Sequence, residues 1–130
     1  MAVPKPQHLL SPTMTSPLRE SLRSRLLRAR RERDTAAVSA LRTAIAAVEN
    51  AEAVPIPAAG PVTEVDRRVL GADEERRLVG DEAADLRLAE RDHRSRGDQQ
   101  RALVAAAGAE VLEQVLAQAP PSASGGRTSA

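Results

Sequence analysis

The chain of 130 residues contains no phenylalanine, tyrosine or tryptophan, so its core has to be built from Leu, Val, Ile and Ala. Small apolar side chains let helices approach each other closely, but each buries little area, at roughly 25 cal/mol per Å². We therefore expect closely packed helices and a modest stability. Cysteine is also absent, which excludes disulfides, a thiolate nucleophile and a Cys-based zinc site.

Apolar residues recur every three or four positions in four stretches, which is the spacing of one helix face. In the stretch RDTAAVSALRTAIAAVENAE, the residues on one line are Val38, Leu41, Ile45 and Val48. No stretch alternates apolar and polar residues as a half-buried strand does. The pattern predicts helices at about residues 17–33, 35–52, 72–96 and 99–119.

Local signals mark the ends of these helices. Ser16 precedes Pro17, which is typical of an N-cap followed by proline at the first helical position. Asp34 and Asp98 are suited to cap the helices that follow them. Gly97 suits the left-handed position that ends many helices.

The remaining segments predict at most a short helical turn, in the stretch TEVDRRVLG. AVPIPAAGP, at 53–61, contains three prolines and a glycine and forms the main connector. We expect a flexible leader over 1–16 and a disordered tail over 120–130. The fold expected for 17–119 is all-α, with two antiparallel helical hairpins packed as one four-helix domain. The residues expected at the seam between the hairpins are Leu41, Ile45, Leu86 and Val111.

The last predicted helix contains a glycine. Its expected apolar face consists of Val104, Ala107, Val111 and Val115, flanked by Leu103, Leu112 and Leu116. Gly108 lies within this helix, where glycine costs about 1 kcal/mol relative to alanine. If Gly108 has no packing role, alanine at this position should stabilise the domain.

Charge is distributed unevenly along the chain. Residues 18–33 carry seven arginines against two glutamates, a net charge of +5, whereas 34–119 carry ten arginines against sixteen carboxylates, a net charge of −6. Two interpretations follow. Either the basic helix pairs with acidic helices of the same chain, or it offers one face to a polyanion.

The sequence shows no catalytic, metal-binding or cofactor-binding pattern. The two histidines, His8 and His93, stand in no metal-ligand spacing. Serines lack a nucleophile elbow and a positioned base, and the phosphate-binding glycine loops are absent. We therefore expect no catalytic residue, no metal and no cofactor. The chain also lacks a signal peptide and a transmembrane stretch, which favours a soluble cytoplasmic protein.

The segment LRESLRSRLLRARRERD is the sequence feature that most directly indicates a function, because arginine is well suited to phosphate contacts. Without aromatic side chains, recognition of single-stranded RNA by aromatic stacking platforms is excluded. Three interpretations remain: a solvated face partly neutralised by acidic neighbours, contact with an RNA backbone, or contact with an anionic membrane surface.

Two blocks of the chain resemble the GatB/YqeY family, specifically its stand-alone YqeY-like proteins. The first contains an Arg33-Asp34 junction after the basic helix, followed by the residues Ser39, Leu41, Arg42, Ala46, Glu49 and Asn50. The second carries the pattern through Glu82, Arg87, Gly97, Ala102, Val111, Leu112 and Leu116. The resemblance covers roughly 18–117. His93 and Asp98 depart from the family pattern, and the usual C-terminal helical subdomain is missing.

The resemblance implies an all-helical fold and kinship with the tail of the B subunit of the glutamine-dependent amidotransferase that acts on misacylated tRNA. In that enzyme the tail contacts tRNA, and the carbon-nitrogen ligase chemistry lies in other domains. It implies a non-catalytic helical adaptor that binds tRNA by backbone contacts. The residues expected to make contact are Arg23, Arg30 and Arg42.

Two alternatives stay open. One is a structural or protein-interaction module in which the basic helix is masked by acidic helices. The other is an accessory to carbon-nitrogen ligase activity in trans, which requires an amidotransferase complex. The expected partners are thus tRNA, an amidotransferase complex or another protein, and not a membrane.

Overall fold

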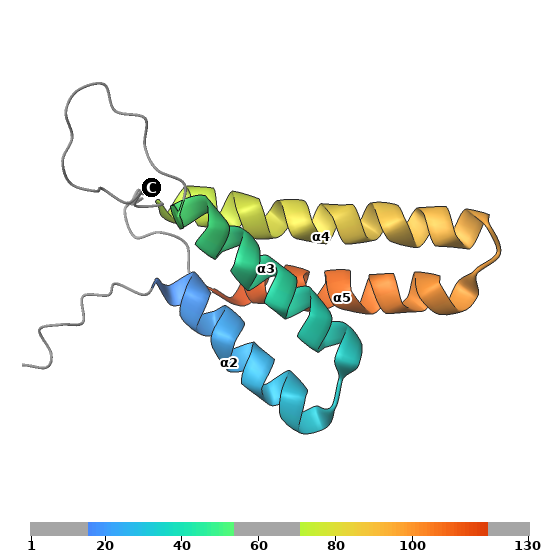
Figure 1. Cartoon of the computed structure of the whole chain (residues 1–130), viewed down its shortest axis with the longest axis horizontal. Coiled ribbons are helices and arrows are strands. Elements are labelled where there is room, and N and C mark those ends of the chain that lie inside the picture. Colours follow the sequence, from blue (N-terminus) through green and yellow to red (C-terminus); the bar gives the residue numbers. More distant parts are fainter. Residues whose placement is uncertain (1–15, 54–70, 120–130) are drawn as a thin grey trace, which may run out of the picture.

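The structure is a computed structural model that describes residues 16–53 and 71–119, which form four α-helices and no strand (Figure 1). The helices are α2 (Pro17–Glu32), α3 (Thr35–Ala53), α4 (Ala72–Ser95) and α5 (Gln99–Gln118). Each begins at the predicted residue, and its end differs from the predicted one by one residue. The all-α, four-helix prediction is confirmed. The expected leader, tail and most of the connector lie outside the described residues.

Side-chain caps begin three of the helices, as their sequences indicate. Ser16 Oγ accepts a hydrogen bond of 3.0 Å from the Arg19 amide at the start of α2. Asp34 and Asp98 each accept a hydrogen bond of 3.1 Å from the amide three residues ahead. These bonds satisfy amides that have no partner inside a helix.

The turn between α4 and α5 is a Schellman motif. Gly97 has a φ of 79°, the left-handed region that glycine adopts without a steric cost. Its amide donates to the Arg94 carbonyl, and the Asp98 amide donates to the His93 carbonyl over 2.9 Å. Gly97 therefore ends α4 and sets the direction of α5.

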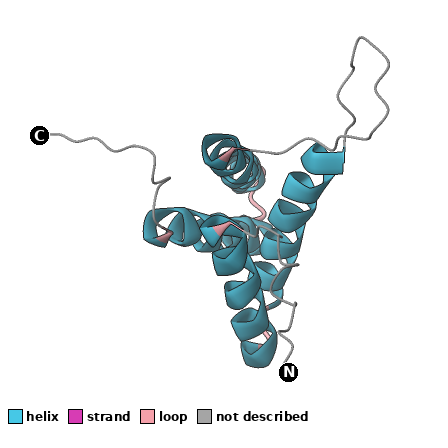
Figure 2. Ribbon diagram, turned by 90° about the vertical axis from the view of Figure 1, so that its left-hand side faces the viewer, coloured by secondary structure: helices cyan, strands magenta, loops and turns pink. Residues whose placement is uncertain are grey.

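The two hairpins cross each other. Figures 1 and 2 show that the α2–α3 pair runs obliquely over the α4–α5 pair instead of parallel to it. The α4–α5 hairpin is the longer of the two and projects beyond the turn between α2 and α3 (Figure 1). The part near the α4–α5 turn is therefore not covered by α2 or α3.

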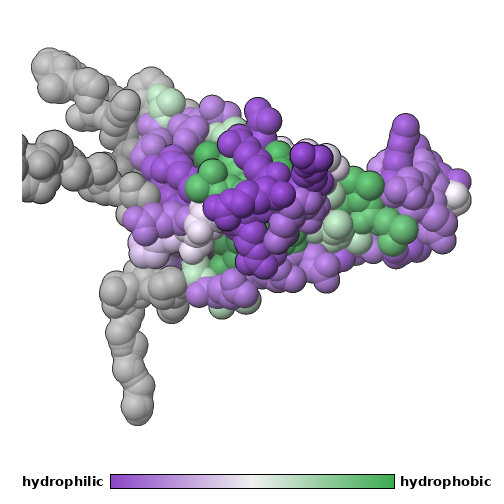
Figure 3. Space-filling view, turned by 90° about the horizontal axis from the view of Figure 1, so that it is seen from below, coloured by the Kyte–Doolittle hydropathy of each residue, from purple (hydrophilic) through white to green (hydrophobic). Residues whose placement is uncertain are grey.

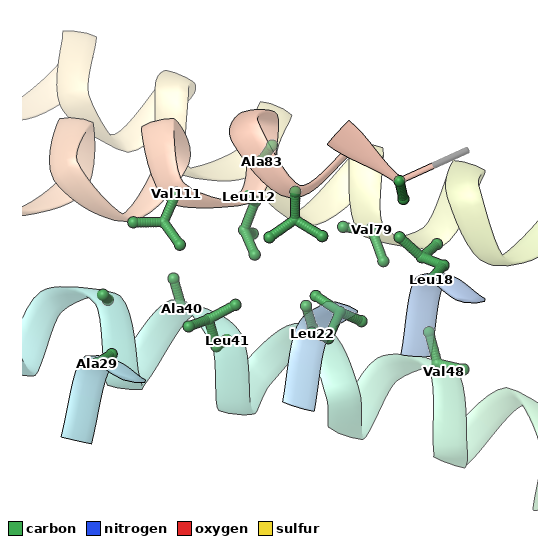
Figure 4. Packing of buried hydrophobic residues seen from close by; sticks show 14 residues of the cluster. Leu18, Leu22, Ala29, Ala40, Leu41, Val48, Val79, Ala83, Val111 and Leu112 are labelled. Carbon is green, nitrogen blue, oxygen red and sulfur yellow. The ribbon is translucent and has the colours of Figure 1, made fainter. Parts of the chain in front are cut away.

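The core lies where the hairpins cross. Leu22, Leu41 and Leu112 are fully buried there, and residues of α3 point toward α4 and α5 (Figure 4). Leu41 and Val111 of the expected seam are buried, and Ile45 and Leu86 are partly buried against this core. One cluster thus contains residues from all four helices.

The apolar face of α5 differs from the prediction. Val104 is 49 % exposed and Leu103 is 60 % exposed, although both were expected on the packed face. The buried residues of α5 are instead Ala102, Ala105, Gly108, Ala109, Val111, Leu112 and Val115. The reason is that the first residues of α5 lie in the projecting part of the hairpin, beyond the place where Gly108 meets Ala40 of α3. Alanines pack against α4, and the larger side chains remain outside.

Candidate functional site

The first half of α2 has its arginines paired with carboxylates of other helices. Arg19 donates to Glu52 of α3 over 2.8 Å and to Glu75 of α4 over 3.0 Å. Arg23 pairs with Glu49 of α3 over 3.2 Å. For this half of the helix, the interpretation as an internally neutralised basic face is correct.

The Arg19 pairs are partly buried. The Glu75 side chain is 4 % exposed and the Arg19 side chain 16 %. The hydrogen bond to Glu52 is the largest of the contributions that raise the pKa of Arg19. One carboxylate oxygen of Glu75, Oε1, has no hydrogen-bond partner among the described residues, so Arg19 is what compensates this buried charge. The network holds α2 against both α3 and α4.

The arginines around the α2–α3 turn differ, because no carboxylate pairs with them. Within 16–53 and 71–119, there is no ion pair or side-chain hydrogen bond to Arg30, Arg31, Arg33 or Arg42. All four are exposed. The region around the α2–α3 turn therefore carries positive charge that no carboxylate of the described residues neutralises. The hydrophilic surface of this region is the large purple area at the centre of Figure 3.

Three of these arginines line one groove of about 480 Å³. Arg30 comes from the last turn of α2, Arg33 from the turn and Arg42 from the third turn of α3. Arg33 adopts the left-handed conformation, with a φ of 58°, and so forms the turn that reverses the chain direction between α2 and α3. This turn places Arg33 in the lining of the groove. Its amide and the Asp34 amide donate to the Arg30 and Ala29 carbonyls, over 3.1 and 2.9 Å.

Hydroxyl groups complete the lining of the groove. Thr35, Ser39 and Thr43 are four residues apart on α3, so they form one row along the helix. With Val38, these residues and the three arginines make up the whole lining, which contains no carboxylate. Guanidinium and hydroxyl groups are among the side-chain donors that bind phosphate groups in proteins. The groove is therefore suited to a phosphate-bearing ligand.

The structure places two of the three predicted contact residues in the groove and the third outside it. Arg30 and Arg42, from two helices, lie in the same groove. Arg23 lies outside it and pairs with Glu49. Arg33 was not among the predicted contacts, although its place directly before the N-cap Asp34 marked it as a turn residue.

No metal centre or membrane-spanning helix is found in the parts of the chain that the structure describes. Within these parts, the side chains of His, Asp and Glu do not form a group of three that could hold a metal ion. The helices there are too short or too polar to cross a membrane.

Comparison of the chain with protein-family models, with curated proteins and with solved structures finds no match. Evidence about function therefore comes from the residues themselves. The strongest local evidence is the arginine-lined groove, that is, the groove between the end of α2 and the start of α3.

Proposed function

We propose that the chain is a non-catalytic helical adaptor that binds structured RNA, such as tRNA, through its phosphate backbone. The observation that supports this proposal is that Arg30, Arg33 and Arg42 line one groove without a carboxylate partner in the described residues. The resemblance to stand-alone YqeY-like proteins points to the same ligand. In this proposal the protein is cytoplasmic, and its RNA-binding surface is the corner between α2 and α3.

The composition of the groove determines the kind of recognition. Arginines and hydroxyls bind phosphate and sugar, which positions a nucleic acid without reading its sequence. The chain has no aromatic side chain on which a base could stack. We therefore expect a ligand recognised by the shape of its backbone, with little preference for sequence.

The test is a titration of the purified chain with total tRNA at two salt concentrations. Three phosphate contacts predict that log K falls against log salt with a slope of about −2 to −3. Between about 50 mM and 200 mM salt, affinity should then fall about 15- to 65-fold. Arg30→Gln and Arg42→Gln should each weaken binding and reduce the slope by about 1.

Arg23→Gln is the matched control, because Arg23 is also an exposed arginine of α2 but is paired with Glu49. It should leave the affinity and the slope nearly unchanged. A chain with no measurable affinity for tRNA even at low salt would remove the RNA proposal. In that case the interpretation as a structural or protein-interaction module gains support from the Arg19 and Arg23 ion pairs.

A further inference from the structure

A second groove lies between α3, α4 and α5 and has a volume of about 390 Å³. Its floor consists of small residues, including Ala40, Ala89, Ala105 and Gly108. Small side chains allow another helix to approach closely. We call this the hairpin groove, because it continues from the crossing point of α3 onto the projecting part of the α4–α5 hairpin.

An apolar side chain is exposed within the hairpin groove. Val104 lines the groove and is 49 % exposed. Leu88 and Leu103 of the same hairpin are 56 % and 60 % exposed and do not line the groove. In Figure 3, apolar surface lies between the polar tip of this hairpin and the arginine-rich surface of α2. An exposed apolar patch with a polar rim is typical of a protein–protein contact.

The end of the groove near α3 is acidic and lacks a cation. Glu82 and Asp85 line it, and neither forms an ion pair with any described residue. Burial raises the pKa of Glu82, and the nearby charges of Asp85 and Asp81 raise it further. A partner that fits here therefore brings a positive charge next to an apolar surface.

The opposite end of the groove carries the complementary charge. Arg101 supplies this charge, and His93 also lines this end, on the other side of the turn between α4 and α5. Eight residues of α4 separate Asp85 from His93, which is about 12 Å along a helix. The carboxylates at one end therefore cannot pair with Arg101 of the same chain. The only acidic partner of Arg101 among the described residues is Asp98, at 3.6 Å.

The hairpin groove is thus complementary to itself in the reverse direction. Ala89 lies midway between Asp85 and His93 on α4, and Val104 lies between the two ends on α5. A two-fold axis near Ala89 and Val104 exchanges the acidic end with the basic end. It also brings the exposed Val104 side chains of the two copies close together.

We propose that the hairpin groove is a self-association surface, occupied by the projecting α4–α5 hairpin of a second copy of this chain in antiparallel orientation. Arg101 and His93 of the second copy then lie beside Glu82 and Asp85, and the reverse contact forms at the other end. Because the contact is limited to one face of each α4–α5 hairpin, the interface is small. We expect a weak dimer whose population depends on concentration.

The experiment is sedimentation velocity of the full chain from roughly 10 µM to roughly 1 mM, the range in which a weak dimer forms. The sedimentation coefficient should rise with concentration for the native chain. Arg101→Glu and Asp85→Arg each place like charges opposite one another at both ends of the interface, and each should abolish the rise. Both positions are exposed in the single chain, and circular dichroism of each variant checks that the fold is retained.

Charge exchange makes the test specific for a second copy. In the double variant with Asp85→Arg and Arg101→Glu, both contacts between copies are again attractive, so the rise should return. An equimolar mixture of the two single variants should also associate. Glu110→Arg and Arg91→Glu are the controls, because they make the same charge changes at exposed residues of α5 and α4 that do not line the groove.

Two results would overturn the proposal. One is a native chain that stays monomeric throughout the concentration range, which would leave another protein or an undescribed segment of this chain as the occupant. The other is self-association that Arg101→Glu and Asp85→Arg leave unchanged. Arg30→Gln should not affect this association, because Arg30 lies in the arginine-lined groove and not in the hairpin groove. The outcome is therefore independent of RNA binding.

Discussion

Gly108 of α5 lies directly against Ala40 of α3, so that a Cβ atom on the glycine would stand 3.2 Å from the Ala40 Cβ. The same atom would be 3.3 Å from Cδ1 of Leu86 on α4. Three helices therefore meet at the one glycine in the middle of α5. The missing side chain sets how closely the α2–α3 hairpin crosses the α4–α5 hairpin.

We predict that Gly108→Ala lowers the free energy of unfolding by about 1 kcal/mol. Alanine gains about 1 kcal/mol of helix propensity, but overpacking a well-filled site costs about 1 to 3 kcal/mol. The Leu86 side chain can rotate away, whereas the Ala40 Cβ is fixed to the backbone of α3. This corrects the expectation of stabilisation, which held only for a glycine without a packing role. Urea denaturation followed by circular dichroism measures the change.

Gly80 of α4 is the matched control for this prediction. A Cβ added there would meet only Cδ1 of Leu116, at 4.0 Å, which is an ordinary contact. Gly80→Ala should therefore stabilise the domain by about 0.5 to 1 kcal/mol. If both substitutions stabilise, the close crossing at Gly108 is not a constraint on packing.

Helix ends were predictable from the sequence, but the crossing of the hairpins was not. Ser16, Asp34 and Asp98 bond to amides only three residues away, so the capping signal is local. The exposure of Val104 depends instead on how far the α2–α3 hairpin extends over α5. Helical periodicity indicates an apolar stripe, and it does not say where the neighbouring helix ends.

The arginine-lined groove was predictable only in part for a similar reason. The excess of arginine in 18–33 indicated a basic surface, and Arg30 and Arg42 were expected contacts. Whether an arginine is neutralised depends on carboxylates distant in sequence, such as Glu49 beside Arg23. The position of Arg33 depends on the left-handed turn, which no periodic pattern encodes.

The second prediction concerns the buried pair of Arg19 and Glu75. Arg19→Met should lower the free energy of unfolding by about 3 kcal/mol, because it leaves a buried carboxylate without its cation. Adding Glu75→Leu should recover most of this loss, since an apolar pair of similar size needs no compensating charge. Thermal and urea denaturation of the single and double variants measure both changes.

Arg23→Met provides the comparison, because the Arg23–Glu49 pair is about half exposed on both sides. Exposed ion pairs contribute about 0 to 1 kcal/mol, so this variant should be almost as stable as the native chain. If Arg19→Met and Arg23→Met lower the free energy of unfolding by equal amounts, burial of the ion pair does not determine how much it contributes to stability.

The third prediction concerns the pH dependence of the contact between α4 and α5. Arg87 donates two hydrogen bonds to Glu113, over 2.9 and 2.7 Å, and these hold the pKa of Glu113 below its ordinary value of 4.5. A lowered pKa in the folded state contributes stability above the ordinary pKa and loses it as the pH falls through the folded value. Arg87→Met should therefore raise the Glu113 pKa toward 4.5 and weaken the fall of stability in acid.

Titration of the Glu113 carboxyl carbon by NMR measures this shift directly. Arg94→Met is the control, because Arg94 bonds to Glu90 and not to Glu113. Hydrogen bonds keep the pKa of Glu90 low, the largest effect coming from Arg87 and the next from Arg94. Arg94→Met should therefore raise the pKa of Glu90. A Glu113 pKa that does not respond to the loss of Arg87 would contradict the assigned cause.

The last prediction is that neither hairpin folds alone. Leu22, Leu41 and Val48 of the α2–α3 hairpin are almost fully buried, and Figure 4 shows α3 facing the α4–α5 layer. Helices of this length are marginal in water without tertiary packing. A peptide of residues 16–53 should therefore show little helical signal and no cooperative melting by circular dichroism. In the full chain, Leu41→Ala should cost about 2 to 5 kcal/mol, because it opens a cavity in the shared core. A peptide that melts cooperatively as a monomeric helical hairpin would show instead that each half has a core of its own.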